Sequence, residues 1–166
     1  MKRRRNIFLG LILFCILFLS ISKNTEAQSP ESFNLITQRT LPGDSKYPLK
    51  RFKEKTTEFL KFTHKSRSTY QQELLAKRLS ELISLKNSKN VNEFPNATQR
   101  FAYQAGKLAD DSYNDSSDDK SKIIKIFDYY KPTLEKMRDN FPSNSPHWLL
   151  SQHDINTLSI LTDRLK

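Results

Sequence analysis

The sequence predicts an all-α fold, a small bundle of about five helices arranged as helical hairpins. The 166 residues include three Gly and a single Val, whereas strands favour β-branched residues and all-β folds need many Gly-rich turns. Apolar residues instead recur at helical spacing along most of the chain. The length is typical of one domain. A single Cys excludes an intramolecular disulfide framework and any zinc site with several Cys ligands.

Residues 1–27 differ from the rest and predict a signal peptide or an uncleaved membrane anchor. A basic start over residues 2–5 precedes an uncharged, mostly apolar run over residues 7–22, and Ala27 closes a small-x-small exit. This order is typical of a secretory signal peptide. The run is shorter than the ~20 residues that a spanning helix needs, so the anchor is the alternative. The basic start keeps the N-terminus in the cytoplasm. We therefore expect an extracytoplasmic protein, secreted or anchored to the cytoplasmic membrane.

The net charge of +10 is concentrated in two segments. Residues 28–166 hold 23 basic and 17 acidic residues, a net +6, and residues 46–67 alone hold eight basic and two acidic residues. The basic character of the exported part therefore belongs to one predicted helix. Such a helix suits an anionic membrane surface; the alternative is a solvated polar face. The expected partner is an unknown protein or an anionic membrane surface. Nucleic acid is not expected, because the body is exported and carries no nucleic-acid-binding motif.

A polar lead-in over residues 28–46, with a turn at residues 41–44, precedes the helical domain predicted over residues 47–166. The first helix starts at Pro48, which suits a first helical turn because the missing N–H has no intrahelical role there. Its apolar positions share one face at helical spacing, and we expect that face to pack with the polar face opposite it in solvent. The residues of this face are Leu49, Phe52, Thr56, Phe59, Leu60 and Phe62.

The second helix, with Ser66 or Ser68 as its N-cap, has a clear apolar stripe. The polar stretch 87–95 separates it from a third helix over residues 96–113. The stripe of the second helix consists of Tyr70, Leu74, Leu75, Leu79, Leu82 and Ile83, and the third helix turns Phe101, Ala105 and Leu108 inward.

An acidic loop over residues 110–119 precedes the fourth helix, in which Pro132 is expected to kink or divide the helix. The last helix is predicted to start at Pro146 or at Asp154, with Trp148 as a packing anchor. The inward residues of the fourth helix are Ile123, Ile124, Phe127, Tyr130, Leu134, Met137 and Phe141, and those of the last helix are Ile155, Leu158, Leu161 and Leu165.

Two blocks of sequence resemble a known bacterial family. Leu-Pro-Gly-Asp at residues 41–44 is followed by Tyr-Pro-Leu-Lys-Arg at residues 47–51 and by Glu54, and residues 75–82 read Leu-Ala-Lys-Arg-Leu-Ser-Glu-Leu. Over roughly residues 41–113 this pattern is similar to the domain-of-unknown-function family 5667. The resemblance implies a helical, exported or membrane-tethered bacterial protein, and it implies no activity. The Lys-rich stretch after residue 51 departs from the family pattern.

Seven residues of these blocks are the candidate interaction residues. One interpretation is a docking surface for an acidic partner, formed by Tyr47, Lys50 and Arg51. The other is architectural: the first helix starts here, its leucine packs, and its basic residues pair with acids such as Glu81, while Arg78 pairs with Glu81 or braces the first helix. The full set is Tyr47, Pro48, Leu49, Lys50, Arg51, Arg78 and Glu81.

The sequence predicts no catalytic, cofactor-binding or metal-binding residue and no small-molecule substrate. The acidic loop lacks the Gly and the closing Glu of a calcium-binding EF-hand loop. His64, His147 and His153 form no metal-binding helix motif, and no nucleophile or phosphate-binding motif occurs.

The expected function is that of a non-enzymatic binding or structural module of the bacterial cell envelope. One alternative is an envelope stress-type protein that binds unfolded chains or metal, which an apolar groove between the first two helices would favour. The other is an enzyme of unrecognised type, which a concave pocket gathering Asp, Glu or His with shifted pKa values would favour.

Overall fold

The computed structural model describes residue 35, residues 37–88 and residues 91–166, and this part of the chain is all-α. It contains five α-helices and no strand, which confirms the predicted fold class. The predicted signal peptide or anchor lies outside the described residues. No helix in the described part is long and apolar enough to cross a membrane. The helices are α2 (Tyr47–Phe59), α3 (His64–Asn87), α4 (Phe94–Ser112), α5 (Ser117–Arg138) and α6 (Pro146–Leu165), and a 3-10 turn, η2 (Val91–Glu93), precedes α4.

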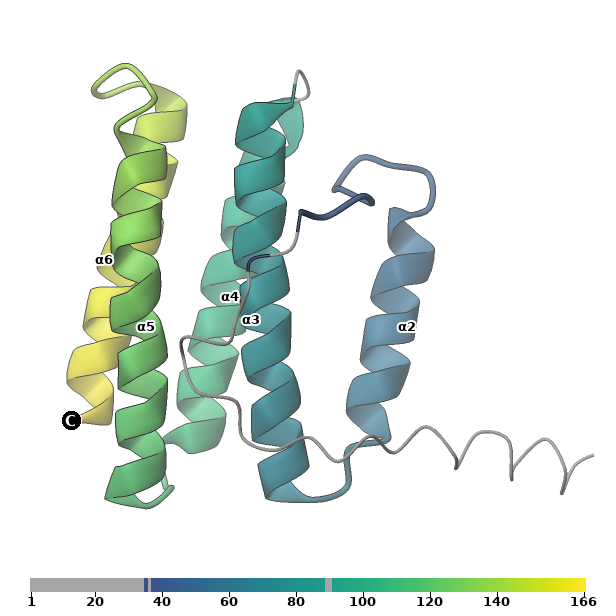
Figure 1. Cartoon of the computed structure of the whole chain (residues 1–166), viewed down its shortest axis with the longest axis vertical. Coiled ribbons are helices and arrows are strands. Elements are labelled where there is room, and N and C mark those ends of the chain that lie inside the picture. The colour runs from purple at the N-terminus through teal and green to yellow at the C-terminus, as the bar shows by residue number, and fades with distance from the viewer. Residues whose placement is uncertain (1–34, 36, 89–90) are drawn as a thin grey trace, which may run out of the picture.

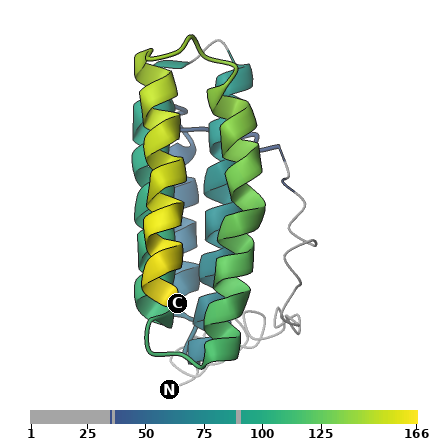
Figure 2. The same cartoon turned by 90° about the vertical axis from the view of Figure 1, so that its left-hand side faces the viewer.

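Helices α3 to α6 form an antiparallel four-helix bundle, and α2 lies outside it beside α3 (Figure 1). Successive helices run in opposite directions, as short connections between neighbours require. The closest backbone approaches join α3 to α4, α4 to α6 and α5 to α6. Figure 2 shows α5 and α6 together on one side of the molecule, with α2 on the opposite side. Helix α2 is therefore a peripheral element.

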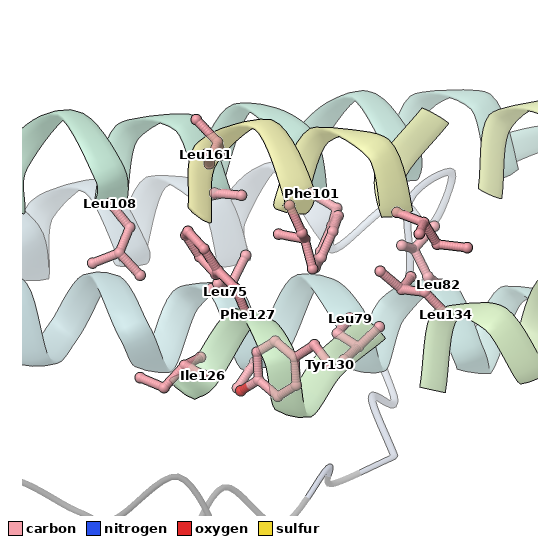
Figure 3. Packing of buried hydrophobic residues seen from close by; sticks show 14 of the residues in the cluster. Leu75, Leu79, Leu82, Phe101, Leu108, Ile126, Phe127, Tyr130, Leu134 and Leu161 are labelled. Carbon is pink, nitrogen blue, oxygen red and sulfur yellow. The ribbon is translucent and has the colours of Figure 1, made fainter. Parts of the chain in front are cut away.

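Among the described residues, the buried side chains of the hydrophobic core come from the four bundle helices, and Leu35 and Leu41 of the lead-in pack against them while partly exposed. Leucines of α3 meet aromatic and aliphatic side chains of α4, α5 and α6 in one interior (Figure 3). No residue of α2 belongs to this cluster. The inward positions predicted for the last three helices are buried, apart from Ile124 and Phe141, which pack against the core while partly exposed.

Each bundle helix begins with a residue suited to that position. The N-cap of α3 is Thr63, whose hydroxyl accepts a hydrogen bond from the Ser66 amide at 3.2 Å, so the prediction of Ser66 or Ser68 as the cap is wrong. Ser116 and Ser145 cap α5 and α6 in the same way. Helices α2 and α4 instead carry Pro in their first turn.

The acidic stretch differs from its predicted structure, and of the two effects predicted for Pro132, a kink or a division of the helix, the division does not occur. Most of residues 110–119 are helical, because α4 continues to Ser112 and α5 begins at Ser117. Asp118 and Asp119 lie in the first turn of α5, where the helix dipole favours negative charge. Helix α5 runs through Pro132 without dividing.

The first helix is turned the opposite way from the prediction. Its apolar side chains were expected to pack, yet they point away from the bundle and are exposed. Its buried residues are Tyr47 and Glu54, on the opposite face. The apolar spacing correctly predicts a helix, and the side of it that packs is decided by charged side chains on α3.

Candidate functional site

The inner face of α2 is polar and binds the bundle through ionised groups. At 100° per residue, Tyr47, Glu54 and Glu58 lie along one line of the helix, and Lys50 and Arg51 lie on either side of it. These five side chains are buried or half-buried, whereas the opposite face is exposed. These side chains form two contacts with the bundle. We call the first contact the α2–α3 charge cluster. It consists of Tyr47, Lys50, Arg51 and Glu54 of α2 with Arg78 and Glu81 of α3.

Two carboxylates and three cations alternate in the α2–α3 charge cluster. Glu81 accepts from Lys50 Nζ at 2.7 Å and from Arg78 Nη1 at 2.6 Å. Glu54 accepts from Arg51 Nη1 at 2.8 Å and from Arg78 Nη2. Arg78 thus joins one carboxylate of each helix, which is the bidentate role for which a guanidinium is suited.

The centre of this cluster is removed from water. The side chain of Arg78 is 1% exposed and that of Glu81 is 0% exposed. Burial alone would lower the pKa of Arg78, but the charges of Glu81 and Glu54 outweigh it and the pKa is raised. The guanidinium of Arg78 therefore stays charged inside the protein.

Tyr47 closes the end of the cluster nearest the start of α2. Its hydroxyl donates to Glu81 Oε2 at 3.1 Å, and the guanidinium carbon of Arg100 on α4 lies 5.0 Å from the centre of its ring. Burial, followed by the charge of Glu81, raises the pKa of Tyr47 to about 12. The phenol is therefore a neutral hydrogen-bond donor at any physiological pH.

A second polar contact lies near the other end of α2. Glu58 accepts from Gln71 Nε2 of α3 at 2.5 Å and pairs with Lys107 of α4. The Tyr70 hydroxyl donates to the backbone carbonyl of Glu54 at 3.2 Å. Helix α2 is thus held at two points by charged and hydrogen-bonding groups.

The outer face of α2 is apolar and exposed. The exposed fraction is 70% for Leu49, 69% for Phe52 and 79% for Phe59, and the face continues past the helix end to Phe62 at 81%. These side chains lie opposite the α2–α3 charge cluster. We call this surface the outer face of α2: Leu49, Phe52, Thr56, Phe59, Leu60 and Phe62.

Lysines border the outer face of α2 on both sides. Lys53 and Lys55 are about 160° apart around the helix, with Phe52 and Thr56 in the arc between them. Both lysines are exposed, as are Lys46 before the helix and Lys65 after it. The exposed surface of this helix therefore combines an apolar stripe with a basic border.

The structure brings together five of the seven sequence-predicted interaction residues. Tyr47, Lys50, Arg51, Arg78 and Glu81 all join the α2–α3 charge cluster, as the architectural interpretation expects. Arg51 pairs with Glu54 rather than with Glu81. Leu49 was expected to pack and instead points outward, because Tyr47 and Glu54 define the inner side. Pro48 is exposed in the first turn.

Glu54 and Arg100, which take part in the first contact of α2, were not among the predicted interaction residues. Glu54 is seven residues after Tyr47, two helical turns on the same face, and that spacing was a usable signal. Arg100 comes from α4, and no local pattern links it to Tyr47. Its position over the Tyr47 ring follows from how α4 packs against α3.

The other sequence candidates are dispersed over the bundle. Asp110 pairs with Arg164, Asp119 pairs with Lys122, and His64 Nε2 lies 3.5 Å from Asp115 Oδ1. The described residues contain no group of three or more His, Cys, Asp or Glu able to hold a metal ion. His147 stacks on Phe141 with ring centres 5.3 Å apart, and Trp148 is half-buried under Arg138.

A groove of about 290 Å³ runs along α3 beside the described part of the lead-in. Its walls are aliphatic, hydroxyl and amide side chains, so it carries no acid, base or nucleophile of shifted pKa. They include Leu41, Ser80, Ile83, Ser84 and Asn87.

Comparisons with protein-family models, with curated proteins and with solved structures give no match for this chain.

Proposed function

We propose that this protein is a non-enzymatic binding module of the bacterial cell envelope, exported or tethered by residues 1–27, whose contact surface is the outer face of α2. The observation that carries the proposal is the set of exposed apolar side chains on that face, with lysines on both sides. Fully burying one such side chain stabilises a protein by about 1.5–3 kcal/mol. A contiguous exposed stripe of them is typical of a surface that meets a partner.

The contacts on the inner face support this role for α2. Charged clusters at two points hold the helix in one orientation, so the outer face is presented without local unfolding. The alternative function, binding unfolded chains, would require an apolar groove between α2 and α3. At that place the described residues include the charged side chains of Arg78, Glu54 and Glu81, which favours the binding module over this alternative.

Photo-crosslinking in intact bacteria tests the contact surface. A photoreactive amino acid replaces Phe59 on the outer face of α2, and a matched variant replaces Tyr129, an exposed aromatic residue of α5. We expect lipid or protein adducts at position 59 that are absent at position 129. Equal adducts at both positions, or none at position 59, would contradict the proposal.

Fractionation of cells that express the tagged full chain tests export. Mass spectrometry of the N-terminus distinguishes the two forms that the sequence predicts. A terminus at Gln28 in the soluble extracytoplasmic fraction means secretion, and an intact Met1 in membranes means an anchor. An intact Met1 in the cytosol would overturn the envelope assignment.

A further inference from the structure

We infer that the partner of the outer face of α2 is an anionic lipid surface, on which the helix lies flat. This inference rests on the proposed function and names the class of its partner.

The shape of the outer face suits a flat, deformable surface. Helix α2 has 13 residues, so it is about 20 Å long. Its apolar side chains are exposed along one side of the helix, and α2 stands at the edge of the described helices, beside α3 (Figure 1). The interfacial region of a bilayer accepts such a helix to a depth of about 5–10 Å, with the polar side kept in water.

The charges around the outer face match anionic headgroups. Lys50 and Arg51 are neutralised by Glu81 and Glu54 inside the protein. Lys53 and Lys55 are instead exposed at the two edges of the stripe, where a lysine can lay its methylene stem along apolar surface and hold its ammonium at headgroup level.

A second copy of this chain fits the same face poorly. Pairing two outer faces would bring the lysine borders of both copies together, and like charges in a contact oppose association. An anionic membrane neutralises both borders at once. Attraction of a lysine to such a surface strengthens binding about fivefold per residue at moderate salt.

In the form of the chain that retains the apolar run in residues 7–22, the length of the segment between this run and α2 also supports a lipid partner. Only 24 residues separate Ser22 from Tyr47. A chain of that length spans at most about 85 Å. Retained in a membrane, the run would confine α2 near the lipid surface and raise its effective concentration there.

The test places a polarity-sensitive fluorophore in the middle of the outer face. The full chain carries Cys15→Ser and Thr56→Cys, with the dye on the new thiol, because Thr56 is exposed at the centre of the stripe. The matched control labels Ile160→Cys, which is 67% exposed. Its helix, α6, lies on the opposite side of the described helices from α2 (Figure 2). The chain is reconstituted with phosphatidylcholine vesicles, with and without about one third phosphatidylglycerol.

We expect the dye at position 56 to shift to the blue and to be quenched by bromine-labelled lipid tails in the anionic vesicles. The same dye at position 160 remains in water. In vesicles of phosphatidylcholine alone, and at about 1 M salt, where the Debye length falls to about 3 Å, the shift at position 56 is largely lost. Changing Lys53 and Lys55 to Gln reduces the ratio of shielded to exposed dye about 25-fold, about fivefold for each lysine.

The vesicle test can overturn this inference without overturning the proposed function. If the dye at position 56 stays in water on anionic vesicles, while Phe59 in cells still gives protein adducts, the outer face of α2 binds a protein and not lipid. If neither experiment gives a contact, both proposals are wrong. Equal shifts at positions 56 and 160 would mean that the chain binds lipid without using α2, which also overturns the inference.

Discussion

Arg78 is the residue on which the attachment of α2 depends. It is almost fully buried and bonds one carboxylate from each of two helices. A buried ion pair is costly to form, because both charges lose their hydration. Once formed, it is more costly to break on one side, because the remaining charge has neither water nor a partner.

Replacing Arg78 with Met therefore lowers the free energy of unfolding by about 3–5 kcal/mol, the range for breaking a buried ion pair. Urea denaturation followed by circular dichroism measures this loss. The control is Lys122→Met, which removes an exposed ion pair with Asp119 and leaves the urea midpoint unchanged. Equal midpoints for Arg78→Met and the unmodified protein would show that the cluster does not hold α2.

Asp154 is the one buried carboxyl group for which an upward pKa shift is resolved in the described part of the chain. It is fully buried in α6, neither of its oxygens has a hydrogen-bond partner among the described residues, and burial raises its pKa to about 8. The ordinary value is 3.8. Between these two pH values the folded protein keeps a proton that the unfolded chain releases. Stability due to this group therefore falls as the pH rises from about 4 to about 8.

The variant Asp154→Asn cannot ionise, so it removes this pH dependence. We expect it to be about 1–3 kcal/mol more stable than the unmodified protein at pH 8, with no gain near pH 4. Urea denaturation at pH 4, 6 and 8 measures the difference. Parallel pH profiles for the two proteins would show that Asp154 does not lose its charge on folding.

At the scale of elements, periodicity in the sequence predicts the helices well and the environment of α2 poorly. The stripes of α3, α4 and α6 are buried as predicted, apart from the partly exposed Ile83 of α3. Each of these stripes has several leucines or phenylalanines at consecutive turns, and these side chains fill the interior shared with the neighbouring helices. Helix α2 also has an apolar stripe, so its pattern alone predicts that this stripe is buried too. The stripe is exposed instead, because the neighbouring surface of α3 is charged, and Arg78 and Glu81 could not remain paired and buried against Phe52.

The site contacts that could not be predicted from the sequence are long-range contacts. The residues of the Tyr-Pro-Leu-Lys-Arg block and of the second block can be recognised as partners, because opposite charges recur on two adjacent helices. The contacts of Arg100 with Tyr47 and of Lys107 with Glu58 depend on how α4 packs, which no local spacing encodes.

Helix α2 should open more easily than the helices of the bundle. It adds no side chain to the hydrophobic core, and its buried contacts are polar. Local stability follows the apolar surface that an element buries. We expect the amides of α2 to exchange with solvent through a local opening, while those of α4 exchange only on global unfolding. Native-state hydrogen exchange measured against urea distinguishes the two, and equal protection in α2 and α4 would contradict the description of α2 as a peripheral element.

At the scale of the whole molecule, the helices that form the core are distinct from the helix that exposes the apolar face. The bundle of α3 to α6 holds the core, and α2 is attached to its side by charge with the apolar side chains outward (Figure 1). The basic residues of α2 fall into two groups, one at its inner face and one beside its outer face. Lys50 and Arg51 serve the attachment, and Lys53 and Lys55 border the exposed stripe.

The orientation of α2 is the central claim, and thiol reactivity tests it most directly. In the full chain with Cys15→Ser, the variant Phe52→Cys places a thiol on the outer face of α2, and Ala105→Cys places one in the core, where the exposed fraction is 0%. We predict that the thiol at position 52 reacts with a maleimide as fast in the folded protein as in urea, whereas the thiol at position 105 is protected until the protein unfolds. A protected thiol at position 52 would contradict the account, because the apolar face of α2 would then be packed and not presented.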